Sequence, residues 1–521
     1  MPSISRQIHE LCSRHHGRTA LVELAWDTAA HRYRRARSIR YGELLDGTLR
    51  LIDALGSLGA GRGDRIAVLL DNSIEMVMSE WACLLSGLVW VALNVRSSAA
   101  EHAGILADCS PSVVLVAAGY RERIQSAALP AGCRIVEIGA GGQWQGLLEA
   151  AHPRVPRREP DPEDPVRIRY TSGTAGKPKG AVLPRRCYDA SLEVVSELIG
   201  PLTAGDVVAQ VAPMTHAAGA MLLPHALAGA TALLADRFDA AAFLALVVEE
   251  RVTAAFLVPT MLLRFIEAAS DGPRPDSLRS IVYGGAAMPV DRLERGLELL
   301  GPVFVQIYGL TESNWPVTAL GREEHLAQGS GGERRRRLAS CGRPTAIGQV
   351  RIVAEGGREA AAGESGELLV RGRNTMTGYW ANRRADVKGL DADGWMHTGD
   401  VAVRDQQGFV TIVDRLHDMI VSGGFNVYPR EVEEALSSHP AVLESAVVGR
   451  ADPQWGERIH AVVVLRPGGA ASEAELAEHV AARTAAYKKP RSFEFTSELP
   501  KNAAGKVLRR ALKLKTTTPP A

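Results

Sequence analysis

The stretch YTSGTAGKPKG, residues 170–180, packs three glycines, four hydroxyl side chains and two lysines into eleven positions. Glycine lets backbone amides come close to a ligand, and free amides together with hydroxyl groups form concave sites for anions. Lysine adds a compact positive charge that suits phosphate. The stretch therefore predicts a phosphate-binding loop, with an ordinary surface turn as the alternative. It is not the common nucleotide P-loop, because Lys177 is followed by Pro178 rather than by the Ser or Thr that holds magnesium.

The run VRIRY ahead of this loop is one of five short apolar runs that have strand length and alternate with longer amphipathic stretches. This alternation predicts an α/β fold. Each run leads directly into a loop with unusual chemistry. The runs are 166–170, 207–213, 254–259, 280–285 and 304–309, and the loops read TSGTAGKPKG, MTHAAG, TM, GAAMP and LTES. Because open α/β sheets bind ligands beyond the carboxyl ends of their strands, we expect the five loops to form one site at one sheet edge.

The composition narrows the class of protein. A chain of 521 residues is too long for a single core, so two to four domains are expected. A net charge of +1 argues against nucleic acid as the partner. We expect no membrane span, because no apolar run reaches about 18 residues, and no signal peptide, because the start of the chain is polar. The six cysteines are scattered without a CxxC pair, which favours reduced thiols and a cytoplasmic location.

The pattern of elements changes twice along the chain. A connector rich in proline and charge, residues 151–165, separates two α/β blocks, and a smaller α+β pattern follows residue 400. We expect an N-terminal domain over 1–413, a hinge at 414–417 and a C-terminal domain over 418–521. The elements expected in the last domain are a helix near 429–438, strands near 443–449 and 459–466, and a helix near 472–486.

Seven motifs occur in the order in which the adenylate-forming superfamily carries them: YTSGTAGKPKG, APMTHAAG, YGLTES, GELLVRGRNTMTGYW, TGD, DRLHDMIVSGGFNVYPREVE and PKNAAGKVLRR. The chain thus resembles acyl-CoA synthetases, adenylation domains and beetle luciferases over nearly its whole length. The resemblance implies a large N-terminal adenylate-forming domain of packed α/β sheets and a small, mobile α+β C-terminal domain. It also implies that a carboxylate attacks ATP, with Mg²⁺ as cofactor, to give an acyl-adenylate and pyrophosphate. The acyl group then passes to the thiol of coenzyme A.

The resemblance also indicates a nucleotide site. Tyr308 is expected to stack on adenine, Asp400 to accept hydrogen bonds from both ribose hydroxyls, and Arg415 to reach ribose or phosphate. Amides, hydroxyls and lysine in the loop after Tyr170 would neutralise the departing pyrophosphate. The full set expected to bind the nucleotide is Thr171, Ser172, Gly173, Thr174, Gly176, Lys179, Gly285, Ala286, Ala287, Tyr308, Gly309, Thr311, Asp400, Arg415 and Lys506.

Four residues are expected to take part in the chemistry: Lys506, His216, Glu312 and Thr171. The Lys506 ammonium can neutralise both the attacking carboxylate and the α-phosphate, the alternative being a solvated surface lysine. Glu312 offers Mg²⁺ a hard oxygen ligand, with helix capping as the alternative. His216 is expected to gate or orient the acid, because a carboxylate already ionised at pH 7 needs no base.

The acyl pocket is expected beside His216 and is lined by Ala217, Ala218, Met221 and Met261. Small and flexible side chains indicate a roomy apolar cavity for a fatty, aryl or bulky polycyclic acid. The motif GGFNVYPREVE looks most like that of fatty acyl-CoA synthetases.

The segment Ser422, Gly423 and Gly424 resembles the lining of the pantetheine channel in CoA-forming members, so the C-terminal domain is expected to rotate between two steps. His417 stands at the hinge, where the family more often has Asp or Lys. That departure leaves the balance between the two domain arrangements open. The four arginines at 334–337 are expected to lie in a solvated loop rather than on a CoA phosphate.

The leading hypothesis is an ATP-dependent carboxylic acid–CoA ligase. The alternative is a stand-alone adenylating enzyme that performs one half-reaction or loads a carrier-protein thiol. Amino acids are disfavoured because the loop THAAGAMLL holds no acid, and a catalytically dead module is disfavoured because Lys506 and Glu312 are both present. The expected partners are a small carboxylic acid, ATP and CoA, and the sequence leaves a homodimer open.

Overall fold

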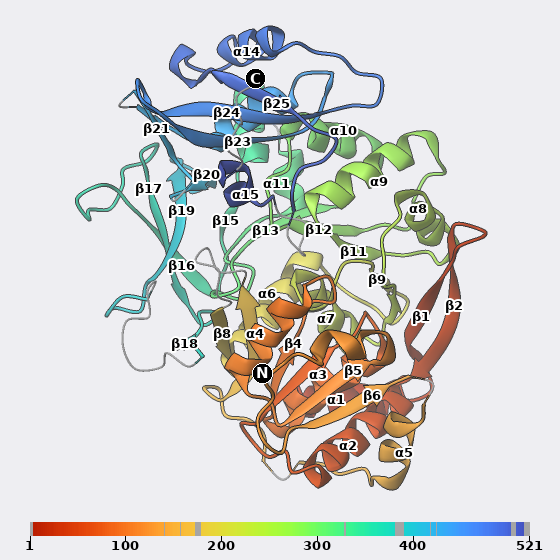
Figure 1. Cartoon of the computed structure of the whole chain (residues 1–521). Helices are drawn as coiled ribbons and strands as arrows, with labels where there is room; N and C mark the ends of the chain where they lie inside the picture. The colour runs from red at the N-terminus through yellow and green to blue at the C-terminus, as the bar shows by residue number, and fades with distance from the viewer. Residues whose placement is uncertain are drawn as a thin grey trace.

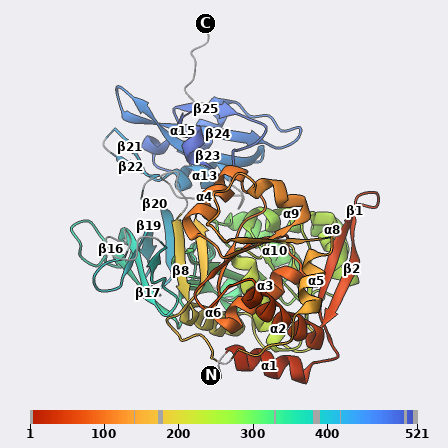
Figure 2. The ribbon, with the colours of Figure 1, turned by 60° about the horizontal axis from the view of Figure 1, so that its bottom comes forward.

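The computed structural model of the chain describes residues 4–139, 141–156, 158–171, 179–327, 330–380, 390–416, 418–423, 425–501 and 507–514. The strands of these residues form four sheets (Figure 1). Two large sheets fill the body of the molecule and a four-stranded sheet stands at their side. The fourth sheet lies at one end, away from α1 (Ile4–Arg14) and α2 (Tyr41–Ser57) in Figure 1 and in Figure 2. The predicted α/β fold is confirmed.

The first large sheet has nine strands in the order β15-β14-β13-β12-β11-β9-β10-β1-β2. Its strands are parallel from β13 to β1, and β14, β15 and β2 add antiparallel edges. The bounds are β1 Thr19–Asp27, β2 Arg32–Arg40, β9 Val207–Gln210, β10 Thr231–Leu234, β11 Ala254–Leu257, β12 Ser280–Gly284, β13 Phe304–Tyr308, β14 Thr318–Leu320 and β15 Arg343–Pro344.

The second large sheet has seven strands in the order β18-β8-β7-β4-β3-β5-β6. It is parallel from β7 to β6, and β8 and β18 are antiparallel. The bounds are β3 Arg65–Leu69, β4 Val89–Ala92, β5 Val113–Ala117, β6 Arg134–Ile138, β7 Pro165–Thr171, β8 Lys179–Pro184 and β18 Gly378–Tyr379.

This topology corrects the expectation of five loops at one sheet edge. The run 166–170 is β7 of the seven-stranded sheet, whereas the other four runs are β9, β11, β12 and β13 of the nine-stranded sheet. Buried strands of both sheets look alike in sequence, because residue composition reports burial and carries no information about the neighbouring strand. The loops therefore come from two sheets that face each other.

Helix α3 (Ile74–Ser86) lies between the two large sheets and is buried on all sides, and its two buried acids, Glu75 and Glu80, form ion pairs with Arg37 and Arg167. The Ser73 side chain caps its first turn by accepting a hydrogen bond from the Met76 backbone N–H, and Gly87 ends it in the left-handed conformation. Trp81 of α3 packs into one core with residues of both sheets, including Val68 and Val282.

The remaining helices of this part cover the outer faces of the sheets or fill the space between them. No helix in the described part of the chain is both long and apolar enough to cross a bilayer. The bounds are α4 Ala99–Cys109, η1 Ala118–Ile124, α5 Gln143–Ala150, α6 Arg185–Ile199, η2 Ala217–Met221, α7 Leu222–Leu227, α8 Ala240–Glu249, α9 Pro259–Asp271, α10 Val290–Leu300, α11 Arg322–Leu326 and α12 Gly331–Ala339.

The third sheet has the order β16-β17-β19-β20, and the fourth has the order β22-β21-β24-β23 with β25 paired to β24. The fourth sheet and its helices enclose a separate core that includes Ile420, Val432 and Ile459. The bounds are β16 Gly348–Val353, β17 Ser365–Gly372, β19 Met396–Arg404, β20 Val410–Arg415, β21 Ile420–Ser422, β22 Phe425–Val427, α13 Pro429–Ser437, β23 Val442–Asp452, β24 Gly456–Leu465, α14 Glu473–Ala481, η3 Ala486–Lys488, β25 Ser492–Phe495 and α15 Arg509–Leu514.

The arginine run at 334–337 is helical rather than a solvated loop, which corrects that expectation. It lies in α12, where the Ser330 side chain caps the first turn. Arg334 lies 3.0 Å from Glu294 of α10, and Arg335 lies 2.7 Å from Asp291. Asp291 and Glu294 are three positions apart and so share one face of α10, where both can pair with the arginines of α12.

The side chain of Asn72, which follows β3, joins the two large sheets. Its Nδ2 lies 3.1, 2.9 and 2.9 Å from the carbonyl oxygens of Gln210, Ala212 and Ala235. Its Oδ1 accepts a hydrogen bond of 2.9 Å from the backbone N–H of Met214. Two N–H groups therefore serve three carbonyls at or just beyond the ends of β9 and β10, and Oδ1 fixes the start of the MTHAAG loop.

We predict that Asn72→Ala lowers the free energy of unfolding by about 1–3 kcal/mol, because three carbonyls and one N–H lose a partner in a partly buried place. Urea denaturation measures the change. Asn94→Ala is the control, because the Asn94 side chain makes one bond, to the backbone of Arg96 in an exposed turn. Its effect should stay within about 0.5 kcal/mol. Equal stability of the two variants would show that the Asn72 amide does not hold the sheets together.

Candidate functional site

Tyr308, Asp400 and Arg415 meet at the junction of the nine-stranded and four-stranded sheets. Tyr308 is the last residue of β13, while Asp400 and Arg415 face each other across β19 and β20. The Tyr308 hydroxyl donates a hydrogen bond of 2.6 Å to Asp400 Oδ2, and Arg415 Nε lies 2.7 Å from Asp400 Oδ1. Only 3% of the Asp400 side chain is exposed. The structure thus brings three predicted nucleotide-binding residues into one network.

This network combines a phenol donor with a carboxylate acceptor. Burial, followed by the adjacent Asp400 carboxylate, raises the pKa of Tyr308 well above its ordinary value, so the phenol stays a donor. Each carboxylate oxygen has a second lone pair, so Asp400 can accept two more hydrogen bonds. The arrangement therefore suits a vicinal diol such as that of ribose. Stacking of adenine on Tyr308 stays a prediction.

The backbone beside this network runs close to its neighbours. A Cβ atom at Gly309 would lie 2.8 Å from Cβ of Trp315, so only glycine fits there without a shift. Gly285 has φ +85°, in the left-handed region that favours glycine, and it opens the exposed loop that continues through Ala286 and Ala287. The backbone of residues 285–287, just beyond β12, is therefore exposed and accessible to a ligand.

Glu312 and Lys179 both contact the Tyr379 side chain, one at its hydroxyl and the other over its ring. The Tyr379 hydroxyl donates a hydrogen bond of 2.9 Å to Glu312 Oε1, and Lys179 Nζ lies 5.3 Å from the centre of the Tyr379 ring. Glu312 caps no helix, because the next helix, α11, begins only at Arg322. In the described part of the chain no basic side chain pairs with Glu312. A carboxylate with an oxygen to spare fits Mg²⁺, which proteins hold through one or two carboxylates.

His216 follows β9 in the loop that Asn72 holds. Its Nδ1 lies 2.7 Å from the Thr215 hydroxyl oxygen. Burial, aided by the positive charges of Arg169 and Arg96, lowers the pKa of His216 to about 4. His216 is therefore a neutral imidazole at pH 7, which suits a group that orients a carboxylate without offering it a proton.

The predicted acyl-pocket residues divide into two kinds. Ala218 and Met221 are each 1% exposed and belong to the core between the two large sheets. Ala217 and Met261 are half-buried and pack against that core from outside. A ligand can reach the half-buried pair without repacking the core, so that pair is the better candidate for contact with an acid.

Arg169 is a residue of this region that the sequence analysis missed. It is 6% exposed, its guanidinium lies 4.0 Å from the centre of the Trp315 ring, and its Nη1 donates a 3.1 Å hydrogen bond to Asn314 Oδ1. Burial lowers the pKa of Arg169 well below its ordinary value. The signal was available, because Arg167 and Arg169 alternate within VRIRY and charged residues are rare in a buried strand.

Gly423, predicted to line a CoA channel, has φ +58° and donates its backbone N–H to the Trp455 carbonyl at 2.8 Å. A Cβ atom there would lie 2.8 Å from Cε3 of Trp455. The structure therefore requires glycine at this position for backbone geometry and for contact with Trp455. Ser422 beside it is buried.

Part of the predicted site lies outside the described residues. The side chain of Thr171 also lies outside them, although its backbone ends β7. The other predicted residues outside the description are Ser172, Gly173, Thr174 and Gly176 of the phosphate loop, His417 of the hinge, Gly424 of the CoA channel, and Lys506. Their predicted roles stay predictions.

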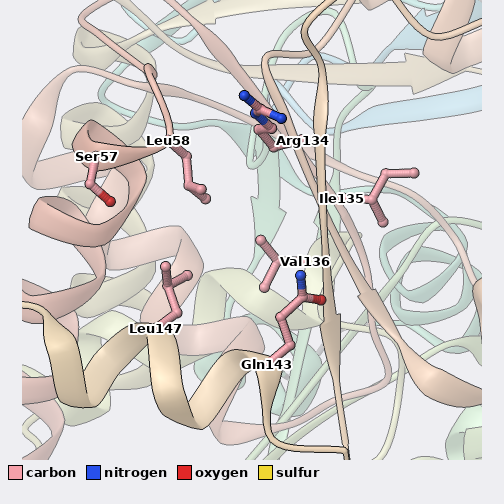
Figure 3. A pocket seen from close by; sticks show the side chains of 7 residues that line it. All are labelled: Ser57, Leu58, Arg134, Ile135, Val136, Gln143 and Leu147. Carbon is pink, nitrogen blue, oxygen red and sulfur yellow. The ribbon is translucent and has the colours of Figure 1, made fainter.

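A hollow of about 420 Å³ lies at the β6 edge of the seven-stranded sheet (Figure 3). Leu58 at the end of α2, Val136 of β6 and Leu147 of α5 surround it, with Ser57 and Gln143 at its rim. It contains none of the predicted site residues and lies at the opposite edge of this sheet from β8 and β18. This hollow is therefore separate from the candidate site.

Comparisons with known proteins agree with this architecture. Residues 8–380 match the family model of AMP-binding enzymes, and residues 431–506 match the model of the AMP-binding enzyme C-terminal domain. A feruloyl-CoA synthase from an Amycolatopsis species is 39% identical over 480 residues, which cover 91% of this chain and 93% of that protein. An indoleacetate–CoA ligase from Aromatoleum aromaticum is 36% identical over 481 residues, which cover 90% of this chain and 92% of that protein.

A solved structure is similar over almost the entire chain. It is that of the o-succinylbenzoate coenzyme A synthetase from Bacillus subtilis in complex with ATP and magnesium ion. The two structures have a TM-score of 0.83 and 28% identity, and the match covers 97% of this chain and 99% of the other. The resemblance inferred from the seven motifs is confirmed.

We predict that Asp400→Ala weakens ATP binding about 10- to 100-fold, which corresponds to the roughly 1.5–3 kcal/mol of a hydrogen bond to a charged acceptor. Isothermal titration with ATP and Mg²⁺ measures the affinity. Glu250→Ala is the matched control, because it breaks the Arg35–Glu250 pair, also an arginine–carboxylate contact, near the β1–β2 hairpin. Unchanged affinity in a folded Asp400→Ala variant would contradict the placement of ribose at Asp400.

We predict that His216 makes folding sensitive to acid. Its pKa in the folded state is about 4, below the ordinary value of 6.5, so between these values only the unfolded state takes up the proton. The stability linked to His216 is complete above pH 6.5 and is lost as the pH falls toward 4.

His216→Gln should therefore reduce proton uptake on unfolding at pH 5 by nearly one proton, seen as a flatter dependence of unfolding free energy on pH. Urea denaturation at several pH values measures the slope. The exposed His152→Gln is the control. A variant at position 216 with the slope of the wild type would show that the imidazole is not held neutral.

Proposed function

Because the chain belongs to the family of AMP-binding enzymes and is an AMP-forming acyl-CoA synthetase, we propose that it activates a hydrophobic carboxylic acid at the Tyr308–Asp400–Arg415 network and passes the acyl group to the thiol of coenzyme A. The observation that carries this proposal is the carboxylate of Asp400, buried and held at both oxygens by a phenol and a guanidinium. Preorganised acceptors of this kind suit a ribose diol.

The residues around this carboxylate supply the other requirements of the adenylation step. Glu312 lies in the loop directly after β13 and would hold Mg²⁺, which supplies positive charge against the phosphates. Lys179 begins β8 with its ammonium exposed and able to reach phosphate. Neutral His216 would orient the acid so that its carboxylate oxygen meets the α-phosphate, and Lys506 would offset the charge of both groups.

The second step needs a different surface. In our proposal the CoA thiol attacks the acyl carbonyl and AMP leaves, with Gly423 and Gly424 beside the pantetheine arm. The left-handed backbone of Gly423, close to the Trp455 ring, supports a fixed turn at that place. Rotation of residues 418–521 about the hinge at 414–417 would move Lys506 away from the bound acyl-adenylate and bring this turn to it. Adenylation and thioester formation could then follow each other at one site.

For the acid, we propose a hydrophobic molecule with an aromatic ring as the first class to test and fatty acids as the second. The two relatives act, by their names, on a feruloyl and an indoleacetate group. The half-buried Ala217 and Met261 would leave room for a planar ring, and methionine adapts its shape to aromatic contacts.

Three finer points belong to the same proposal. A carrier-protein thiol is the alternative acceptor. A cytoplasmic location is supported by six cysteines that form no disulfide, which suits a reducing compartment. A homodimer stays a prediction.

A screen of acids with ATP, Mg²⁺ and CoA tests the proposed function. We expect thioesters, detected by mass spectrometry, from hydroxycinnamic and arylacetic acids or from medium-chain fatty acids. Adenylate without thioester for every acid would favour a carrier protein as acceptor. Absence of both products across the panel would contradict the proposal.

We predict that Lys506→Ala abolishes pyrophosphate release from acid and ATP, with a loss of about 10²-fold or more, as for removal of one preorganised charge. The variant should still convert supplied acyl-adenylate and CoA to thioester, because that step brings no second anion to the α-phosphate. Lys501→Ala is the control in the same segment, since Lys501 is paired with Glu444 at 2.7 Å. Equal loss of both steps in Lys506→Ala would contradict the division of labour.

A further inference from the structure

Two opposite charges contact one aromatic side chain at the edge of the candidate site. The Lys179 ammonium lies over the face of the Tyr379 ring, and the Glu312 carboxylate accepts a hydrogen bond from the hydroxyl at its edge. Neither Lys179 nor Glu312 takes part in an ion pair with any residue that the structure describes. Tyr379 thus contacts both charged groups and neutralises neither of them.

Without such a partner the two charges would tend to pair with each other. Lysine and glutamate have long side chains, and a contact within about 4 Å forms readily between opposite charges at a surface. A direct Lys179–Glu312 pair would occupy the ammonium that a phosphate needs and the oxygens that a metal ion needs. A phenol avoids this outcome, because it offers a ring face to a cation and a hydroxyl donor to an anion.

The backbone holds Tyr379 in this intermediate position from both sides. Tyr379 pairs with Ala181 in the β18–β8 ladder, and the Trp380 backbone N–H donates a 2.7 Å hydrogen bond to the Gly180 carbonyl. Two residues before β18, the Met376 backbone N–H donates a 2.8 Å hydrogen bond to the Glu312 carbonyl. The segment 376–380 therefore joins the strand that begins with Lys179 to the loop that carries Glu312.

We propose that Tyr379 is a positioning residue that keeps the Lys179 ammonium and the Glu312 carboxylate apart, so that the first remains available to phosphate and the second to Mg²⁺. This inference rests on the proposed function, because it assumes that ATP and Mg²⁺ bind here. Its consequence is specific: loss of the hydroxyl should impair the metal-dependent part of nucleotide binding and spare the metal-independent part.

The test is equilibrium binding of ATP to the full-length chain by isothermal titration, once with saturating Mg²⁺ and once with EDTA. We expect Tyr379→Phe to bind ATP with Mg²⁺ roughly 10-fold more weakly, as for loss of a group that orients a metal ligand. The concentration of Mg²⁺ at half-saturation should rise by a similar factor. Binding in EDTA should change by less than about twofold, because the ring still supports Lys179.

Two more variants separate this role from a structural one. Tyr379→Leu removes the ring as well, so it should also weaken binding in EDTA. Tyr120→Phe removes another phenol–carboxylate bond, from Tyr120 to Asp71 at 2.8 Å, and should leave both affinities unchanged. In a Glu312→Gln background, Tyr379→Phe should cause no further loss with Mg²⁺, because the two side chains act on the same metal ion.

The outcomes distinguish this inference from the proposed function. Failure of the wild-type chain to bind ATP with Mg²⁺ would overturn both. Wild-type binding together with an unchanged Tyr379→Phe variant would overturn the inference alone. Equal weakening of Tyr379→Phe with Mg²⁺ and in EDTA would also overturn it, because a tyrosine that only supports the fold affects both conditions alike.

Discussion

The side-chain amide of Asn72 connects the two large sheets at the place where the candidate site begins. The carbonyl of Gln210 at the end of β9, the carbonyls of Ala212 and Ala235 just beyond β9 and β10, and the N–H of Met214 converge on it, so this residue ties the path of the His216 loop to both sheets. Backbone polar groups beyond the strand ends lack a ladder partner and need another one when they are partly buried. An asparagine offers both a donor and an acceptor and can satisfy such groups on two segments at once. The geometry around His216 therefore depends in part on the side-chain amide of Asn72.

Charges at the site are arranged so that each keeps its availability. Asp400 is neutralised only in part, because a phenol and a guanidinium hold its two oxygens and leave lone pairs for hydroxyl donors. Lys179 and Glu312 each contact Tyr379, and His216 is kept neutral by burial and by nearby arginines. Preorganised groups need no rearrangement when a charged ligand or transition state forms. The hydroxyls of Tyr308 and Tyr379 each donate to a carboxylate without cancelling its charge, whereas Arg415 forms an ion pair with Asp400.

The sequence alone predicted much of the chemistry and less of the arrangement. The sequence placed Tyr308 at the end of a strand, which agrees with β13, and it made no prediction of local structure for Asp400, which lies in β19. The assignment of 166–170 to the same sheet as the other four runs was wrong, because apolar strands carry no mark of their neighbour. The arginine run at 334–337 looked solvated because its charges are contiguous, yet α12 places two of them against acids of α10. Arg169 was missed although its alternation with Arg167 in a buried strand was visible, and Tyr379 was missed because its partners Glu312 and Lys179 lie far away in the sequence.

By itself, the sequence determined the chemical groups of this protein, the order of its motifs and its membership of an enzyme family. Those properties follow from residue type and local spacing, which a linear chain displays directly. Only the tertiary structure decided that the phosphate loop and the His216 loop come from two facing sheets, that Asp400 lies between a phenol and a guanidinium, and that Tyr379 contacts both Lys179 and Glu312. Contacts of this kind depend on which strands become neighbours, and that choice is made by the packing of the whole chain rather than by any short stretch of it.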